Sequence, residues 1–207
     1  MAEIKLTKNE LRNVQNKLHQ LERYLPTLQL KKALLQAQVN ESRAEIAKLE
    51  IDYQEKTRTV EEFAPLLAEY QSQDLSEFVT IKKLSKHYEN IAGVDVPVFE
   101  AVTFSELNYN LFDTPVWFES AIFQIRALNL VFARIVIERE KKEALEKELR
   151  EVSIRVNLFE KILIPRCEEQ IKTIKVFLGD AQLAAVSQAK VAKTKIEQQL
   201  HKTLDTW

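Results

Sequence analysis

Residues 155–172 read RVNLFEKILIPRCEEQIK, a helical pattern with a proline in its middle. Before this proline, apolar residues recur at alternating spacings of four and three, at Leu145, Leu149, Val152, Val156, Phe159 and Leu163. The spacing is typical of a helix that packs one apolar stripe in a coiled coil. Pro165 lacks a backbone N–H, and its ring collides with the carbonyl of Lys161. Such a residue costs about 3 kcal/mol inside a helix.

The apolar pattern changes phase at this proline. Leu163, Cys167 and Ile171 are spaced by four and four, before the three-and-four repeat resumes through Ile174, Leu178 and Ala181. One extra residue between successive stripe positions predicts a local adjustment of the helix here.

A second heptad repeat occupies the N-terminal third of the chain. LTKNEL (6–11) has the pattern of a capping box, with Thr7 and Glu10 three residues apart. Apolar residues follow at positions 11, 14, 18, 21, 25, 28, 35, 39, 46, 49, 53, 60, 63, 67 and 70, and Lys32, Ser42 and Lys56 fill the remaining stripe positions. The repeat predicts one helix over residues 8–70, interrupted in sequence by Pro26 and Pro65 without a change of phase.

Composition favours few turns and long elements. The 207 residues include 2 glycines, 45% hydrophobic and 29% charged residues, and the formal net charge is −1. The sequence has no uninterrupted run of about 18 apolar residues, so it does not predict a membrane span. The polar start MAEIKLTKNE does not resemble a signal peptide. A single cysteine, Cys167, suits a reducing cytosol. Both chain ends are basic and residues 37–80 are acidic, which fits either solvated helix faces or a basic tip that meets an acidic partner.

The middle of the chain has a different pattern. The stretch VTIKKLSKHYENIAGVDVPVFEAVTF contains Gly93, Pro97 and several β-branched residues. It predicts one or two short strands or a hairpin, with Pro97 on an edge strand. Asp113-Thr114-Pro115 resembles a helix start, with proline at the first helical position.

These patterns predict an all-α-dominated fold, a long antiparallel two-helix coiled coil with a small middle segment. The expected parts are an N-terminal helix (1–71), a compact middle segment (72–116) and a C-terminal helix (117–207). With the chain reversing near residue 94, the numbers of facing residues should sum to about 190. The last twenty or so residues then extend past the first helix, either as a frayed tail or as a partner contact through Leu200 and Leu204.

This register also brings the two helix-breaking prolines to one level. Pro165 should face residue 25, beside Pro26. One hypothesis is a deliberate bend or twist of the coil at this level. The alternative is that helix packing simply offsets the cost of each proline.

The residues do not predict catalysis, cofactor binding or metal binding. The sequence has no glycine-rich phosphate loop, and His19, His87 and His201 are scattered without metal-ligand spacing. A basic face with interleaved aromatics, expected for nucleic-acid binding, is missing. The sequence therefore predicts a non-enzymatic coil that does not bind nucleic acid.

Four motifs resemble the D subunit of the V-type and A-type rotary ATPases and ATP synthases. They are LTKNEL (6–11), LQLKKALL (28–35), ENIAGVDVP (89–97) and RVNLFEKILIPRCEEQIK (155–172). The resemblance covers essentially the whole chain in one order. Leu6, Pro26, Ile154 and Phe159 depart from the family pattern, which indicates a divergent, bacterial member.

The resemblance implies a rotor shaft inside a ring of catalytic and nucleotide-binding subunits, where ATP is bound. Its lower end would bind the F subunit and the cup-like adaptor of the membrane ring, on the cytoplasmic face of a membrane but without inserting into it. Rotation would couple ATP synthesis or hydrolysis to proton or sodium translocation. Signature or partner-contact candidates are Arg155, Val156, Asn157, Ile164, Pro165, Arg166, Lys31, Lys32, Gly93, Pro97, Leu200 and Leu204. A coiled-coil tether, adaptor or chaperone arm is the alternative function.

Overall fold

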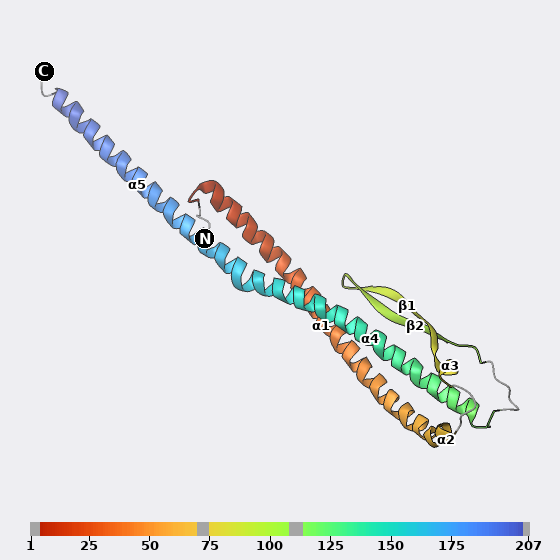
Figure 1. Ribbon diagram of the computed structural model, residues 1–207. Coiled ribbons are helices and arrows are strands. Elements are labelled where there is room, and N and C mark those ends of the chain that lie inside the picture. Colours follow the sequence, from red (N-terminus) through yellow and green to blue (C-terminus); the bar gives the residue numbers. More distant parts are fainter. Residues whose placement is uncertain (1–4, 70–74, 108–113, 205–207) are drawn as a thin grey trace. The chain divides into compact units, whose positions relative to one another are not determined.

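The computed structural model describes residues 5–69, 75–107 and 114–204. The elements in chain order are α1 (Lys8–Glu61), α2 (Ala64–Glu69), α3 (Leu75–Val79), β1 (Ile81–Ile91), β2 (Val94–Phe104), α4 (Phe118–Leu158), the π-helical turn η1 (Phe159–Leu163) and α5 (Ile164–Leu204) (Figure 1). They form two compact units. One comprises Met1–Gln29 with Ile154–Trp207, and the other comprises Leu30–Ser153.

The predicted fold class is confirmed. The protein is mostly helical, α1 packs against α4, and a two-stranded antiparallel hairpin lies in the middle of the chain. The predicted N-terminal stripe is also correct, because each of its positions from Leu11 to Leu67 is buried or half-buried. The backbone N–H of Glu10 donates to the Thr7 hydroxyl over 3.3 Å, so Thr7 caps the helix as predicted.

The first helix is shorter than the predicted 8–70. It ends at Glu61, and a separate short helix, α2, follows from Ala64. Pro65 explains the break. It cannot donate a hydrogen bond to the carbonyl of Glu61, and its ring would clash with that carbonyl in a continuous helix. In the first turn of α2 the same proline is tolerated, because the N–H there has no partner within the helix.

In the unit Leu30–Ser153, three ion pairs join α1 to α4, and two of them have the predicted antiparallel register. Arg43 pairs with Glu146 and Arg139 with Glu50, each over 2.7 Å. In both pairs, the two residue numbers add up to about the 190 expected for facing residues. The hydrogen bond from Arg43 lowers the pKa of Glu146, so this pair stabilises above the carboxyl's unfolded pKa and is lost as the pH falls through the folded value. Exposed pairs contribute at most about 1 kcal/mol, so they favour the register more than they stabilise the fold.

Helix α4 is covered on two opposite faces in its first half. Val131 and Ile135 lie on one face and Ala133 and Ile137 on the opposite one, and all four are buried. Burial on two faces requires apolar residues around most of the helix. The helix Phe118–Glu197 accordingly contains an 18-residue window with mean hydropathy 1.6, long and apolar enough to match a membrane span by length and composition. Arg126 interrupts the apolar run, and 33% of the window is buried within the protein.

The predicted hairpin is present, and its strands are longer than expected. β1 and β2 each contain 11 residues and pair antiparallel, with Ile91 opposite Val94 at the turn. Both turn residues have positive φ, 52° at Ala92 and 81° at Gly93, which is the requirement of a tight two-residue hairpin turn. The Asn90 side chain accepts a hydrogen bond from the Gly93 N–H over 3.0 Å and stabilises this turn.

In the unit of Met1–Gln29 and Ile154–Trp207, the phase change at Pro165 takes the form of a π-helical turn. The N–H of Ile164 donates to the carbonyl of Phe159, five residues earlier, in the turn directly before the proline. A π-turn inserts one residue into the helical repeat, as the spacing of Leu163, Cys167 and Ile171 predicted. Val14, Leu21 and Cys167 form a buried cluster there, with Leu18, Phe159, Leu163, Ile164 and Ile171 packed against it.

The two prolines are accommodated differently. Pro26 lies within the continuous α-helix α1, whereas Pro165 follows the π-turn. Both are exposed, so water can reach the carbonyls that lose a helical partner. Since Leu21 and Cys167 share one cluster, the prolines lie a few residues from the same level. Whether they bend the coil stays a hypothesis.

The last long helix begins later than its sequence suggested. Thr114 and Pro115 precede the helix, which starts at Phe118 after a turn closed by a 3.0 Å bond from the Phe118 N–H to the Pro115 carbonyl. Asp113 lies outside the described residues.

We expect Pro26→Ala to raise the free energy of unfolding by about 1–3 kcal/mol, because alanine restores a hydrogen bond and removes a ring clash in an exposed helix interior. Pro165→Ala should raise it less, because the π-turn already moves the preceding carbonyls. Urea denaturation followed by circular dichroism measures both. Pro65→Ala is the matched control and should change little. A Pro26→Ala variant no more stable than the Pro65→Ala control would contradict this account.

Candidate interaction surfaces

The described residues contain no metal-binding constellation. No group of three or more His, Cys, Asp or Glu side chains among them is arranged to hold a metal ion. Cys167 is buried within the apolar cluster around Val14 and Leu21, which fits a packing role. The features to explain are therefore surfaces, one in each unit.

The first surface is the C-terminal extension, residues 181–197 of α5. Every residue in this stretch is exposed. The last residues of the helix with partial burial are Leu178 and Gly179. Four large apolar side chains are more than half exposed there, namely Leu183 at 68%, Val186 at 58%, Val191 at 56% and Ile196 at 57%. With spacings of three, five and five residues, they lie on several sides of the helix.

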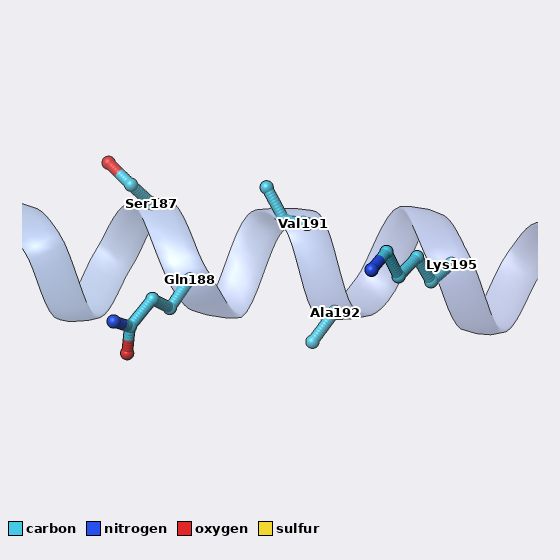
Figure 2. A pocket seen from close by; sticks show the side chains of 5 residues that line it. All are labelled: Ser187, Gln188, Val191, Ala192 and Lys195. Carbon is cyan, nitrogen blue, oxygen red and sulfur yellow. The ribbon is translucent and has the colours of Figure 1, made fainter.

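A shallow depression lies on this extension. It is lined by Ser187, Gln188, Val191, Ala192 and Lys195, all from one helix (Figure 2). Because one helix alone cannot enclose a ligand, this depression is not a small-molecule pocket.

The second surface is the hairpin on α4, in the other unit. At its base, the Arg126 guanidinium donates to the carbonyls of Phe78 and Ser105, and Asn129 donates to the Val79 carbonyl over 2.9 Å. The bonds to Phe78 are 2.8 and 2.7 Å long. Arg126 therefore joins the end of α3 and the end of β2 to one turn of α4.

Further contacts follow along the hairpin. The Arg134 guanidinium lies 5.0 Å from the Phe99 ring centroid, a cation–π distance. Lys86 donates to both carboxylate oxygens of Glu140 over 2.9 and 3.0 Å, and this hydrogen bond raises the pKa of Lys86.

The turn of the hairpin meets a residue of α1. Lys31 Nζ lies 3.8 Å from the position that a Cβ would take on Gly93. The same ammonium pairs with Glu148 of α4 over 2.6 Å. Lys31 and Gly93, two separate residues of the family-signature set, are thus brought together.

The other predicted signature residues are dispersed. Val156 and Ile164 belong to the packed interior of their unit, whereas Arg155, Asn157, Pro165 and Arg166 are exposed. Lys32 is half-buried at a stripe position of α1. Pro97 is buried opposite Tyr88 in the hairpin. Leu200 and Leu204 lie in α5, and their side chains fall outside the described part. Their roles as partner contacts stay predictions.

Sequence reasoning missed the residues of α4 that hold the hairpin. Arg126 and Arg134 are the only charged residues between positions 120 and 137, and both contact it. The sequence signal for these residues was the presence of two isolated arginines in an apolar helical run. A charged side chain on a helix face that other elements cover needs a partner.

β1 is the more exposed strand of the hairpin. Most of its residues are exposed, including Leu84 at 38% and Tyr88 at 60%. These two lie on one face of the strand together with Lys86, which pairs with Glu140 of α4, while Lys83 and His87 lie on the other face.

Comparison with known proteins identifies the family. The sequence profile of the ATP synthase D subunit matches residues 10–194. The V-type ATP synthase D subunit of Chlamydia felis is 44% identical over 199 residues, covering 95% of each chain. The protein of the same name from Chlamydia abortus is 42% identical over 199 residues, also covering 95% of each. That of Chlamydia trachomatis serovar L2 is 40% identical over 200 residues, covering 95% of this chain and 98% of the relative.

A profile match over most of the chain and near-full-length identities of 40–44% agree with the four motifs and with the paired helices around a central hairpin. A tether, adaptor or chaperone arm, the alternative from sequence, does not explain this combination. The chain belongs to the ATP synthase D-subunit family, and it is a non-catalytic central-stalk rotor component of a V-type ATP synthase.

Proposed function

We propose that the chain transmits torque between the nucleotide-binding ring and the membrane ring through two separate contact regions. The extension 181–197 contacts the catalytic and nucleotide-binding subunits. The unit with the hairpin contacts the lower-stalk partners, the F subunit and the cup-like adaptor. The complex stands on the cytoplasmic face of a membrane, and rotation couples ATP synthesis or hydrolysis to proton or sodium translocation.

The exposed apolar extension carries this proposal. A helix of the length of 181–197 that stays bare over its entire circumference is not stabilised by tertiary packing. Its alanines and long side chains favour the helix locally. The apolar side chains contribute hydrophobic stabilisation only if another protein covers them, and these are Leu183, Val186, Val191 and Ile196. The surface carries both signs of charge, including Lys193 paired with Glu197 over 3.8 Å. A mixed apolar and polar helix of this type suits repeated contact with several ring subunits.

The hairpin unit supports the second contact region. Two exposed β-strand edges are either paired or protected in natural proteins. β2 is the more buried strand, and β1 carries the exposed Leu84 and Tyr88. Lys82 and Lys83 at the start of β1 discourage pairing with other copies of the chain. This face fits a specific lower-stalk partner.

We expect simultaneous replacement of Leu183, Val186, Val191 and Ile196 by alanine to weaken ring assembly or lower coupling efficiency at least about tenfold. Alanine keeps the helix but removes most of the apolar contact area. Binding of the F subunit should be unchanged. Pull-down of the reconstituted subunits and ATP-driven ion pumping measure the two effects. The control variant replaces the exposed residues Gln182, Lys190, Lys193 and Thr194, none of which lines the depression, by alanine. Equal loss of ring binding and F-subunit binding would contradict the assignment.

We also expect Leu84→Ser with Tyr88→Ser to weaken binding of the F subunit or the adaptor about tenfold while ring assembly is retained, because an apolar anchor is lost from the exposed strand face. Lys83→Ser with His87→Ser, on the opposite face of the same strand, is the control. Titration by isothermal calorimetry measures the affinities. Undiminished binding of both partners to the Leu84/Tyr88 variant would place the lower-stalk contact elsewhere.

A further inference from the structure

Arg126 holds the chain both where it enters and where it leaves the hairpin. Its guanidinium donates two hydrogen bonds to the Phe78 carbonyl, over 2.8 and 2.7 Å, and another to the Ser105 carbonyl. Phe78 is the second-last residue of α3, and Ser105 directly follows β2. The two ends of the hairpin also meet each other, because the Ser105 N–H donates to the Thr80 carbonyl over 3.4 Å.

These bonds satisfy main-chain groups that have no partner within their own helix. The last carbonyls of any α-helix lack an intrahelical donor. In α3 the Phe78 carbonyl accepts from Arg126, and the next carbonyl, of Val79, accepts from Asn129 over 2.9 Å. All these contacts are part-buried. A part-buried carbonyl that loses a charged donor costs more free energy than a broken surface ion pair.

An apolar cluster packs beside these hydrogen bonds. The Phe78 side chain is buried together with Phe118 and Ile122 of α4. The two phenylalanine rings meet edge to face, with centroids 6.1 Å apart. Ile122 lies one helical turn before Arg126. The polar and apolar contacts of α3 therefore fall on one short stretch of α4.

The charged contacts farther along the hairpin are exposed. The side chains of the Lys86–Glu140 ion pair are 33% and 49% exposed. Arg134, which lies against the Phe99 ring, is exposed as well. Exposed ion pairs and exposed cation–π contacts each change an equilibrium by no more than about fivefold. Among these polar contacts, those of Arg126 therefore fix the hairpin most strongly.

We propose that Arg126 is a positioning residue that fixes the α3–hairpin segment, residues 75–105, in one orientation on α4. This orientation presents β1 to the lower-stalk partner, so the inference rests on the proposed function of the hairpin unit. A guanidinium suits the role because its planar fork bonds two carbonyls at once. A lysine ammonium has the same charge but no such fork.

Docking of the segment is measured in the full-length chain with a thiol reporter. Ile122 is 0% exposed in the cluster with Phe78, so a cysteine at position 122 reacts with a maleimide probe only when the segment leaves α4. The reporter is placed in a Cys167→Ala background. A second reporter, Leu145→Cys, lies in the apolar seam, where Leu145 is also 0% exposed. Labelling rates are compared between variants that carry the same reporter.

Arg126→Gln should accelerate labelling at position 122 at least about thirtyfold, because both carbonyls lose a charged donor. Position 145 should stay within about twofold of the parent. Arg126→Lys should remain at least about tenfold faster than the parent, because a single nitrogen replaces the fork. The matched controls are Arg134→Gln, which changes the other arginine of the same apolar run, and Lys86→Gln. Each control should accelerate labelling by less than about fivefold.

Partner affinity separates positioning from direct contact. Arg126→Gln, without the reporters, should weaken binding of the F subunit or of the adaptor about tenfold when each is titrated by isothermal calorimetry. The affinity should return when Phe99→Cys and Arg134→Cys are joined by a short bis-maleimide in the Cys167→Ala background. The parent side chains are in contact, so this link holds the hairpin on α4 again. The same cysteines without the cross-linker should not restore binding.

Four results would overturn the proposal. They are equal acceleration at positions 122 and 145, acceleration by Arg134→Gln as large as by Arg126→Gln, a parent rate in Arg126→Lys, and a loss of affinity that the cross-link does not reverse. Unchanged affinity in Arg126→Gln would also overturn it if the Leu84/Tyr88 variant is weakened. If the proposed lower-stalk contact is itself wrong, neither variant loses affinity, whereas labelling at position 122 still accelerates in Arg126→Gln.

Discussion

The apolar seam between antiparallel helices is the interaction on which the rest of the structure depends. In one unit it is built from α1 and α4, with Leu35, Val39, Leu145 and Val152 at 0% exposure. In the other, Val14 and Leu21 pack with Cys167. Full burial of one such aliphatic side chain contributes about 1.5–3 kcal/mol. The ion pairs are exposed and individually weak by comparison, so charge favours a register that apolar packing stabilises.

The seam also determines what the helices can tolerate. A proline on the exposed side of a helix costs a hydrogen bond but leaves the apolar stripe in contact, as at Pro26. At Pro165 the stripe would rotate out of contact without compensation. The π-turn Phe159–Leu163 inserts one residue and returns Cys167 and Ile171 to the seam. Continuous packing therefore coexists with two helix-breaking residues.

Much of this arrangement could be predicted from sequence, because heptads report the burial of one stripe directly. The stripe of α1, the cap at Thr7, the central hairpin and the phase change near Pro165 all follow from local spacing. The end of α1 at Glu61 was missed, since short-range chemistry at Pro65 outweighed the longer pattern. α4 starts at Phe118, one residue from the predicted boundary of 117, but Pro115 lies in the preceding turn and not at the first helical position. The second covered face of α4 was also missed. A helix buried on two sides shows no single stripe, and only the isolated Arg126 and Arg134 indicated it.

The contact between Lys31 and Gly93 lies beyond what short motifs predict. Each residue belongs to a separate motif, and neither motif indicates that they meet. Their proximity depends on the length of β1 and β2 relative to α4 and on the position of the Arg126 base. Tertiary geometry of this kind links distant residues without any periodic signal in the sequence.

The claim that the extension and the hairpin unit contact different subunits is tested most directly by lysine cross-linking of the assembled ATP synthase, read out by mass spectrometry. Lys190, Lys193 and Lys195 report on the extension, and Lys82 and Lys83 on the more exposed strand of the hairpin. The account predicts that the first group cross-links to catalytic and nucleotide-binding subunits and the second to lower-stalk subunits. Cross-links from the extension to lower-stalk subunits, or from the hairpin to the catalytic subunits, would contradict it.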